Sequence, residues 1–162
     1  ILGCETAHWL ANEYGKNVTV LEMLPHFMMG VCTANRGHLL HYLEKSGVRL
    51  YNCTKVKALA KDGVYVEQNQ SQTVPDPYNT WQPLLPPNIP NPMEKAIKEE
   101  IVEKKIPADL IVLAMGGKAD ETFFFEAGEE HLAKEIYNIG DSSRAGRVLE
   151  AVRGAYHLAV RI

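Results

Sequence analysis

The first part of the chain alternates between helix-like and strand-like patterns of apolar residues. Residues 4–14 place apolar side chains at helical spacing, and Gly15 follows as a stop signal. A short apolar strand is predicted over residues 18–21, and a second helix over residues 33–45. Extended structure resumes over residues 48–51. This order of helix, strand, helix and strand predicts a β-α-β arrangement of the α/β class.

The middle of the chain predicts a small β-meander followed by a proline-rich segment. Residues 55–59 and 63–67 are short β-rich stretches, and the Asp62-Gly63 pair between them is a strong hairpin signal. Residues 69–92 then hold seven of the nine prolines and show neither helical nor strand periodicity. We expect this proline-rich segment to be an extended loop or linker.

The last part of the pattern predicts a surface helix, a buried strand and a final strand-turn-helix unit. A helix with one narrow apolar stripe is expected over residues 92–104, because proline suits a first helical turn. The continuous apolar run 110–114 predicts a central strand of a parallel sheet, covered on both faces. Residues 135–139 predict a strand, which a glycine turn at Gly140 joins to a helix over residues 147–162.

Composition and charge narrow the classes of function. The 162 residues are 46% hydrophobic and 23% charged, which suits one domain or two small ones. The net charge of −3 and the scattered Lys and Arg residues predict no nucleic-acid partner. No apolar run approaches the roughly 20 residues that span a bilayer, so we expect no membrane partner and a cytoplasmic location. Cys4, Cys32 and Cys53 are irregularly spaced, which predicts reduced thiols and no metal site.

The main candidate chemistry lies in the run from Ile1 to Ala7 and at the acidic end of the first strand. Gly3 and Glu22 have the spacing of about 20 positions found in a dinucleotide-binding β-α-β unit. There a glycine lets helix and strand pack closely, and an acidic residue accepts the ribose hydroxyls. The negative charge of Glu22 would repel a 2′-phosphate, so NADH is favoured over NADPH. Because the chain opens inside this motif, we expect a fragment of a longer polypeptide without the first strand and leading glycines.

Three separated stretches, residues 3–23, 108–116 and 137–141, follow one another in a family-specific order. This order resembles the C-terminal part of flavin-dependent pyridine-nucleotide oxidoreductases, in the family that includes 2,4-dienoyl-CoA reductase, 2-enoate reductase and trimethylamine dehydrogenase. The resemblance implies a Rossmann-like three-layer βαβ fold of the FAD/NAD(P)-binding type. Residues 1–114 would then form an NAD(P)H-binding domain with the proline-rich segment as an insertion, and residues 115–162 would return to the FAD-binding domain.

The resemblance also implies two nucleotide sites and an electron path. NADH and FAD would be contacted by Gly3, Glu22, Gly116, Gly140 and Asp141, with Asp141 accepting hydrogen bonds from the flavin ribityl chain. Electrons would continue to an FMN and an iron–sulfur cluster on the N-terminal portion of the same polypeptide, where an enoate-type substrate is reduced or an amine oxidised. No side chain here is assigned as catalytic, because hydride transfer belongs to the cofactors.

Other interpretations use the same residues differently. A non-catalytic nucleotide-binding or interaction module is the alternative function, with the proline-rich segment as a docking surface. A methyltransferase-like domain would also use Gly3 and Glu22, but it gives no reason for the later Gly140-Asp141 turn. Glu22 could also be a solvated strand end. A missing first strand would leave an open position in the sheet, which favours self-association into a homo-oligomer.

Overall fold

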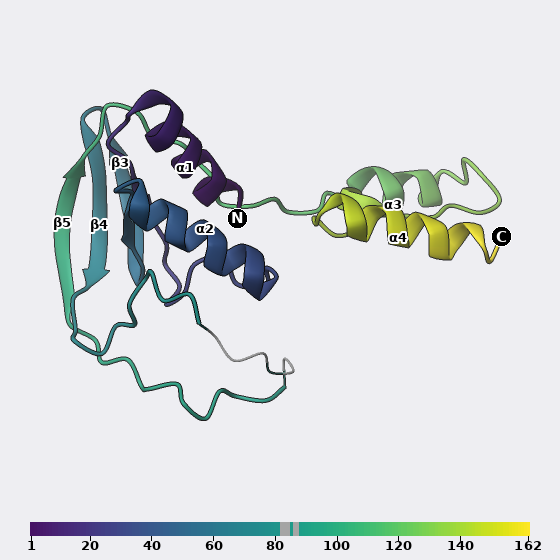
Figure 1. Cartoon of the computed structure of the whole chain (residues 1–162). Coiled ribbons are helices and arrows are strands. Elements are labelled where there is room, and N and C mark those ends of the chain that lie inside the picture. Colours follow the sequence, from purple (N-terminus) through teal and green to yellow (C-terminus); the bar gives the residue numbers. More distant parts are fainter. Residues whose placement is uncertain (82–84, 86–87) are drawn as a thin grey trace. The chain divides into compact units, whose positions relative to one another are not determined.

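The computed structural model describes residues 1–81, 85 and 88–162. The chain divides into two compact units, Ile1–Ala114 and Met115–Ile162, which are drawn in Figure 1 and described separately below. The prediction that the first unit binds NAD(P)H and the second FAD stays a prediction. Five residues of the proline-rich segment, 82–84, 86 and 87, lie outside the described residues.

A parallel β-α-β unit forms the centre of the first unit, preceded by one helix. The two strands pair in parallel, with Thr19 opposite Arg49. The first helix ends at Gly15, whose left-handed φ of 59° and N–H bond to the Leu10 carbonyl terminate it. These elements confirm the helices and strands predicted from the apolar pattern: α1 Leu2–Tyr14, β1 Thr19–Leu21, α2 Thr33–Lys45 and β2 Arg49–Tyr51.

The core of the first unit lies between the two helices and the parallel strands. Helices α1 and α2 pack against each other, and α1 also contacts β1 (Figure 1). Leu40 and Leu43 of α2 are fully buried, as is Val48 at the start of β2. Each such side chain contributes about 1.5–3 kcal/mol when removed from water. This packing fixes the position of β1, and therefore of the residues that follow it.

A three-stranded antiparallel sheet completes the first unit, in the order β3-β4-β5. Its strands are β3 Thr54–Ala60, β4 Gly63–Asn69 and β5 Ile101–Pro107. The hairpin predicted at Asp62-Gly63 is confirmed between β3 and β4. A side chain at Gly63 would collide with the Ile106 carbonyl of β5, so this turn requires glycine.

The helix predicted over residues 92–104 is wrong. Described residues 92–100 are irregular, and β5 begins at Ile101 and pairs with β4 along its whole length. Lys105 forms an ion pair with Asp62 at 2.6 Å, and the Lys104 ammonium lies 4.6 Å from the centre of the Tyr51 ring. Backbone pairing with β4 therefore outweighs the weak helical stripe, as tertiary contacts commonly do for short segments.

The central strand predicted over residues 110–114 does not form. Leu110 is 72% exposed and Leu113 is 65% exposed, and no described strand pairs with this run. Its apolar composition predicts burial between layers, but a strand also needs neighbours that bond its backbone groups. Within the described residues the parallel sheet contains only β1 and β2, so the run lacks such a neighbour.

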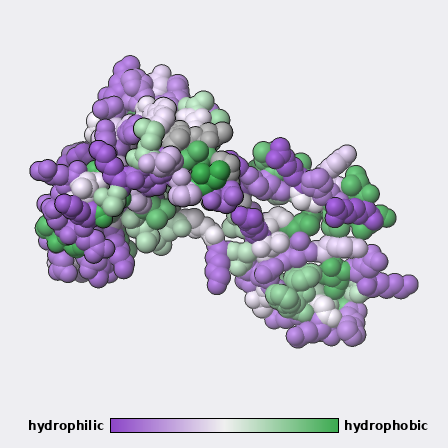
Figure 2. Space-filling model, turned by 90° about the horizontal axis from the view of Figure 1, so that it is seen from below, coloured by the Kyte–Doolittle hydropathy of each residue, from purple (hydrophilic) through white to green (hydrophobic). Residues whose placement is uncertain are grey.

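The second unit is helical. It contains α3 Thr122–Glu129, the short 3₁₀ helix η1 Gly140–Ser142 and α4 Val148–Ala159. The final helix is therefore confirmed, whereas the strand predicted over residues 135–139 does not form because no described strand lies beside it. Many apolar side chains of this unit reach the surface, among them Phe123 and Val148, and Figure 2 shows apolar surface on its drawn face.

Candidate nucleotide-binding site

Gly3 lies in the first turn of α1 against the end of the run 110–114. A Cβ built at Gly3 would lie 2.9 Å from the Cβ of Ala114, closer than carbon atoms approach in proteins. Any side chain at this position would force the helix and the extended segment apart. Gly3 therefore permits the close contact that the glycine of a dinucleotide-binding motif provides.

Glu22 follows β1 directly and is held at both its backbone and its side chain. Its N–H donates to the Tyr51 carbonyl and its carbonyl accepts from the Thr54 N–H, both at 2.9 Å. The carboxylate Oε1 accepts from the Leu24 N–H at 3.0 Å. Among the described residues no hydrogen bond reaches Oε2. The carboxylate is thus oriented by one oxygen and has the other available to accept ligand hydroxyls.

The negative charge of Glu22 affects the pKa of Cys4 in the first turn of α1. Burial raises the pKa of the Cys4 thiol, and the negative charges of Glu22 and Glu5 raise this pKa further. Glu22 follows β1 directly, and β1 contacts α1, at whose start unpaired backbone N–H groups favour anions. The structure thus brings Gly3 and Glu22 into one neighbourhood, suited to a phosphate at the helix start and a ribose at the carboxylate.

Two buried polar side chains fix the loop that follows Glu22, and the sequence analysis did not identify either. Arg36 of α2 donates from Nε to the Phe27 carbonyl at 2.9 Å. Asn52, directly after β2, donates from Nδ2 to the Pro25 carbonyl at 2.7 Å. The one sequence signal is the arginine in the first turn of α2, where the helix dipole disfavours a positive charge.

The other predicted site residues lie in the second unit. Gly116 and Gly140 have φ angles of 82° and 69°, the left-handed region that favours glycine. Asp141 belongs to η1, and its Oδ1 accepts from the Gly146 N–H at 3.1 Å. Its carboxylate is exposed. The roles of these three residues toward a cofactor stay predictions, as do those of Gly3 and Glu22.

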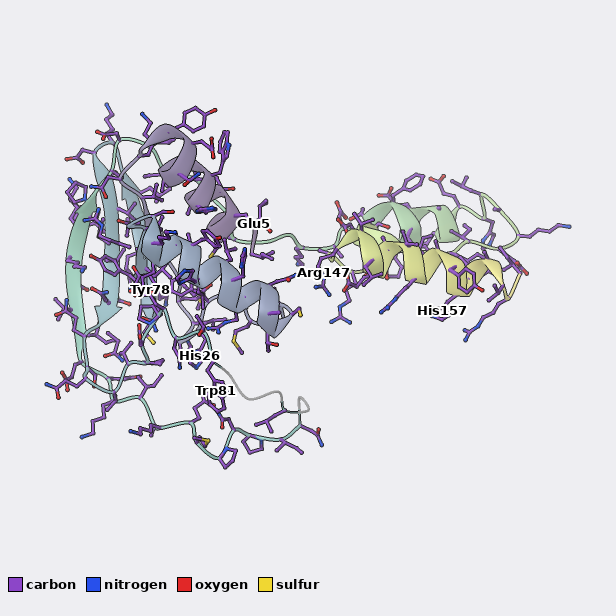
Figure 3. The ribbon with its side chains drawn as sticks, in the orientation of Figure 1. Glu5, His26, Tyr78, Trp81, Arg147 and His157 are labelled. Carbon is purple, nitrogen blue, oxygen red and sulfur yellow. The ribbon has the colours of Figure 1, made fainter. Side chains whose placement is uncertain are left out.

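The start of α4 carries its own carboxylate. Glu150 accepts from the Arg147 backbone N–H at 3.1 Å and forms an ion pair with the Arg147 guanidinium, which is labelled in Figure 3. The hydrogen bonds from Arg147 lower the pKa of Glu150 to about 2. Glu150 therefore already occupies the N-terminus of α4.

Metal clusters and membrane-spanning helices are both absent from the described part of the chain. Within it, no three His, Cys, Asp or Glu side chains are grouped so as to hold a metal ion. No described helix is long and apolar enough to cross a membrane.

Comparisons with known proteins identify the family. The model of the pyridine nucleotide-disulphide oxidoreductase family matches residues 1–153. The chain belongs to this family of oxidoreductase-type domains, whose members generally bind FAD and NAD(P)H. Its fold is confirmed as an α/β nucleotide-binding domain with a parallel β-α-β unit and a small antiparallel sheet.

A solved structure shares this fold. It is 2-naphthoyl-CoA reductase in complex with 2-naphthoyl-CoA, with a TM-score of 0.69 and 24% sequence identity. The match covers 99% of this chain but only 20% of the reductase chain. Among curated proteins, no sequence matches.

Proposed function

We propose that residues 1–162 are the nucleotide-binding portion of a longer flavin-dependent oxidoreductase that takes a hydride from NADH and passes it to FAD. The observation that carries the proposal is the oriented Glu22 carboxylate near the Gly3 helix start, in a family that binds FAD and NAD(P)H. The nicotinamide and the flavin supply the hydride chemistry when bound. The side chains described here bind and orient them.

Glu22 would accept the hydroxyls of the adenosine ribose. The Leu24 N–H holds Oε1, so the carboxylate presents Oε2 in a fixed direction. A 2′-phosphate at the same place would put two negative charges together at a half-buried position, where repulsion is weakly screened. The site is therefore proposed to prefer NADH.

Asp141 would accept hydrogen bonds from the flavin ribityl chain, with Gly140 making the turn that presents it. The left-handed φ of Gly140 and the exposed carboxylate of Asp141 support this role. Electrons would then continue to FMN and an iron–sulfur cluster on an N-terminal portion of the same polypeptide, where an enoate-type substrate is reduced or an amine oxidised. The family resemblance supports that path.

The Glu22 role is tested by the nucleotide preference of the full-length enzyme. Replacing Glu22 with Ala should lower kcat/KM for NADH by roughly 10- to 100-fold, since a hydrogen bond to a charged group contributes about 1.5–3 kcal/mol. The kcat/KM for NADPH should change less, so the preference for NADH over NADPH should become smaller. Glu44→Ala, which removes an exposed carboxylate from α2, is the matched control and should change neither value. Equal use of both nucleotides by the wild-type enzyme would contradict the role.

The Asp141 role is tested by flavin retention. Asp141→Ala in the full-length protein should weaken FAD binding by about 1.5–3 kcal/mol, because the ribityl hydroxyls lose a charged acceptor. FAD content after dilution and gel filtration measures this loss. Asp120→Ala removes another exposed carboxylate of the second unit and should leave the flavin content unchanged. Full retention of FAD by Asp141→Ala would remove this residue from the flavin site.

The non-catalytic interaction module has weaker support. Its docking surface was expected on the proline-rich segment, but Tyr78 and the carbonyls of Asn79 and Thr80 bond to the body of the first unit. Polar groups used inside the unit are not available to a partner.

A further inference from the structure

The proline-rich segment begins at the end of β4, where the side chain of Asn69 bonds to residues just before β5. The Asn69 side chain, which is buried, accepts from the N–H groups of Ser71 and Glu100, both at 3.1 Å. Its Nδ2 donates to the Lys98 carbonyl at 2.7 Å. One amide therefore joins the end of β4 to the residues just before β5.

Tyr78 of the proline-rich segment lies against the edge of β2 that does not face β1. The Tyr78 hydroxyl donates to the Val48 carbonyl at 2.6 Å and accepts from the Leu50 N–H at 3.2 Å. Neither backbone group faces β1, which pairs with the alternate residues of β2. The Tyr78 hydroxyl thus takes the place of a neighbouring strand at these two backbone groups; Tyr78 is labelled in Figure 3.

Three consecutive residues of the loop after Glu22, namely Pro25, His26 and Phe27, are tied to the proline-rich segment or to Glu94 just beyond it. Asn52 Nδ2 donates to both the Pro25 and the Pro75 carbonyls, at 2.7 and 2.9 Å. His26 Nε2 lies 3.9 Å from Glu94 Oε1, and burial lowers the pKa of His26, so this pair is weak at neutral pH.

The third tie is Arg36. Its guanidinium donates from Nε to the Phe27 carbonyl at 2.9 Å and from Nη1 to the Asn79 carbonyl at 3.0 Å. The segment passes α2 at the neighbouring Gly37, where a Cβ would make an ordinary van der Waals contact, 3.5 Å from the Cβ of Thr80. One side chain therefore joins the loop after Glu22, α2 and the proline-rich segment.

The position of Arg36 destabilises the helix start, because a buried positive charge in the first turn of α2 is unfavourable. It is 3% exposed, burial lowers its pKa, and it stands in the first turn of α2, where the dipole favours an anion. Among the described residues no carboxylate pairs with it. A buried guanidinium without an anion is stabilised only by the carbonyls that it joins.

We propose that Arg36 is a positioning residue for the pyridine nucleotide, which couples the proline-rich segment to the loop after Glu22 so that this carboxylate keeps the geometry that selects NADH. This inference rests on the proposed role of Glu22. Without the guanidinium, the carbonyls of Phe27 and Asn79 lose a shared donor and the loop relaxes. The Leu24 N–H then no longer fixes Glu22. The loss falls on binding of the adenosine end and not on hydride transfer.

The test uses the full-length flavoprotein with Arg36→Ala, Arg36→Lys and the control Arg49→Ala. Arg49 is an exposed arginine of β2 whose Nη2 donates to Asn17 Oδ1 at 3.1 Å. For Arg36→Ala we expect the KM for NADH to rise about tenfold, kcat to stay within about twofold, and the preference over NADPH to fall. Lys should restore part of the preference, and Arg49→Ala should match the wild type. Circular dichroism, together with FAD content, reports whether each variant is folded.

Two results overturn the inference and differ from failure of the proposed function. If the wild type prefers NADH through Glu22 but Arg36→Ala leaves KM and preference unchanged, Arg36 has no positioning role. If Arg36→Ala does not fold, a folded Arg36→Met variant, which keeps the apolar stem but has no hydrogen-bond donor, overturns the inference when its KM and preference equal those of the wild type. The proposed function itself is contradicted if the wild-type enzyme does not oxidise NADH. It is also contradicted if Glu22→Ala leaves the preference for NADH over NADPH unchanged.

Discussion

At the residue scale, burial affects the pKa of a cysteine thiol more than its place at a helix start does, as Cys4 shows. Cys4 lies in the first turn of α1, where a helix start would favour a thiolate. Burial nevertheless raises the pKa of Cys4, and it also raises that of Cys53. Cys32, just before α2, is exposed. The thiol nearest the nucleotide site is therefore expected to be unreactive.

Alkylation of the full-length protein with iodoacetamide tests whether the exposed thiol reacts before the buried ones. Cys32 should react first at neutral pH, because it is accessible. Cys4 should react last, because it is buried and its raised pKa leaves little thiolate at neutral pH. Peptide mass spectrometry measures the rate at each site. If Cys4 is modified as fast as Cys32 at pH 7, the thiol is activated and the account of the helix start is wrong.

Part of the candidate site could be proposed from the sequence because the spacing of Gly3 and Glu22 is a local signal, which follows from one helix and one strand. The structure places Gly3 in the first turn of α1 and Glu22 directly after β1. Arg36 and Asn52 could not be found in this way. Arg36 meets Asn79 across 43 positions of sequence, and only the folded path of the proline-rich segment brings them together.

At the scale of elements, periodic helices were predictable and isolated strands were not. The helix α2 was predicted over the residues that it occupies, because its apolar face repeats at helical spacing. Residues 110–114 and 135–139 have strand-like composition but no described strand to pair with. β5 has a helical stripe but lies beside β4. A strand depends on its neighbours, which local pattern does not encode.

The edge of β2 gives a prediction for one hydrogen-bonded side chain. Tyr78→Phe removes the hydroxyl shared by Val48 and Leu50, which should cost about 1–3 kcal/mol because both backbone groups lose their partner. Hydrogen exchange by mass spectrometry on the full-length protein should show faster exchange in the peptide that contains Leu50. Tyr137→Phe removes an exposed hydroxyl bonded to Glu135 and should leave that peptide unchanged. Unchanged exchange in Tyr78→Phe would mean that the segment does not protect this edge.

At the scale of the whole molecule, membership of a longer flavoprotein stays a proposal. The chain corresponds to 20% of the naphthoyl-CoA reductase chain that shares its fold. The second unit exposes large apolar side chains, with Val148 80% and Phe123 75% accessible. Surface of this kind is typical of residues that contact other protein. Whether residues 1–162 alone form a homo-oligomer stays a prediction.

Anaerobic titration of the full-length protein with NADH tests the central claim most directly. The flavin absorbance near 450 nm, followed during the titration, is expected to fall as NADH is added, and NADPH should be needed at roughly tenfold higher concentration or more, because Glu22 disfavours the 2′-phosphate. The protein should also carry FAD in a ratio close to one per chain. A full-length protein that holds no FAD, or whose FAD neither nucleotide reduces, would contradict the account.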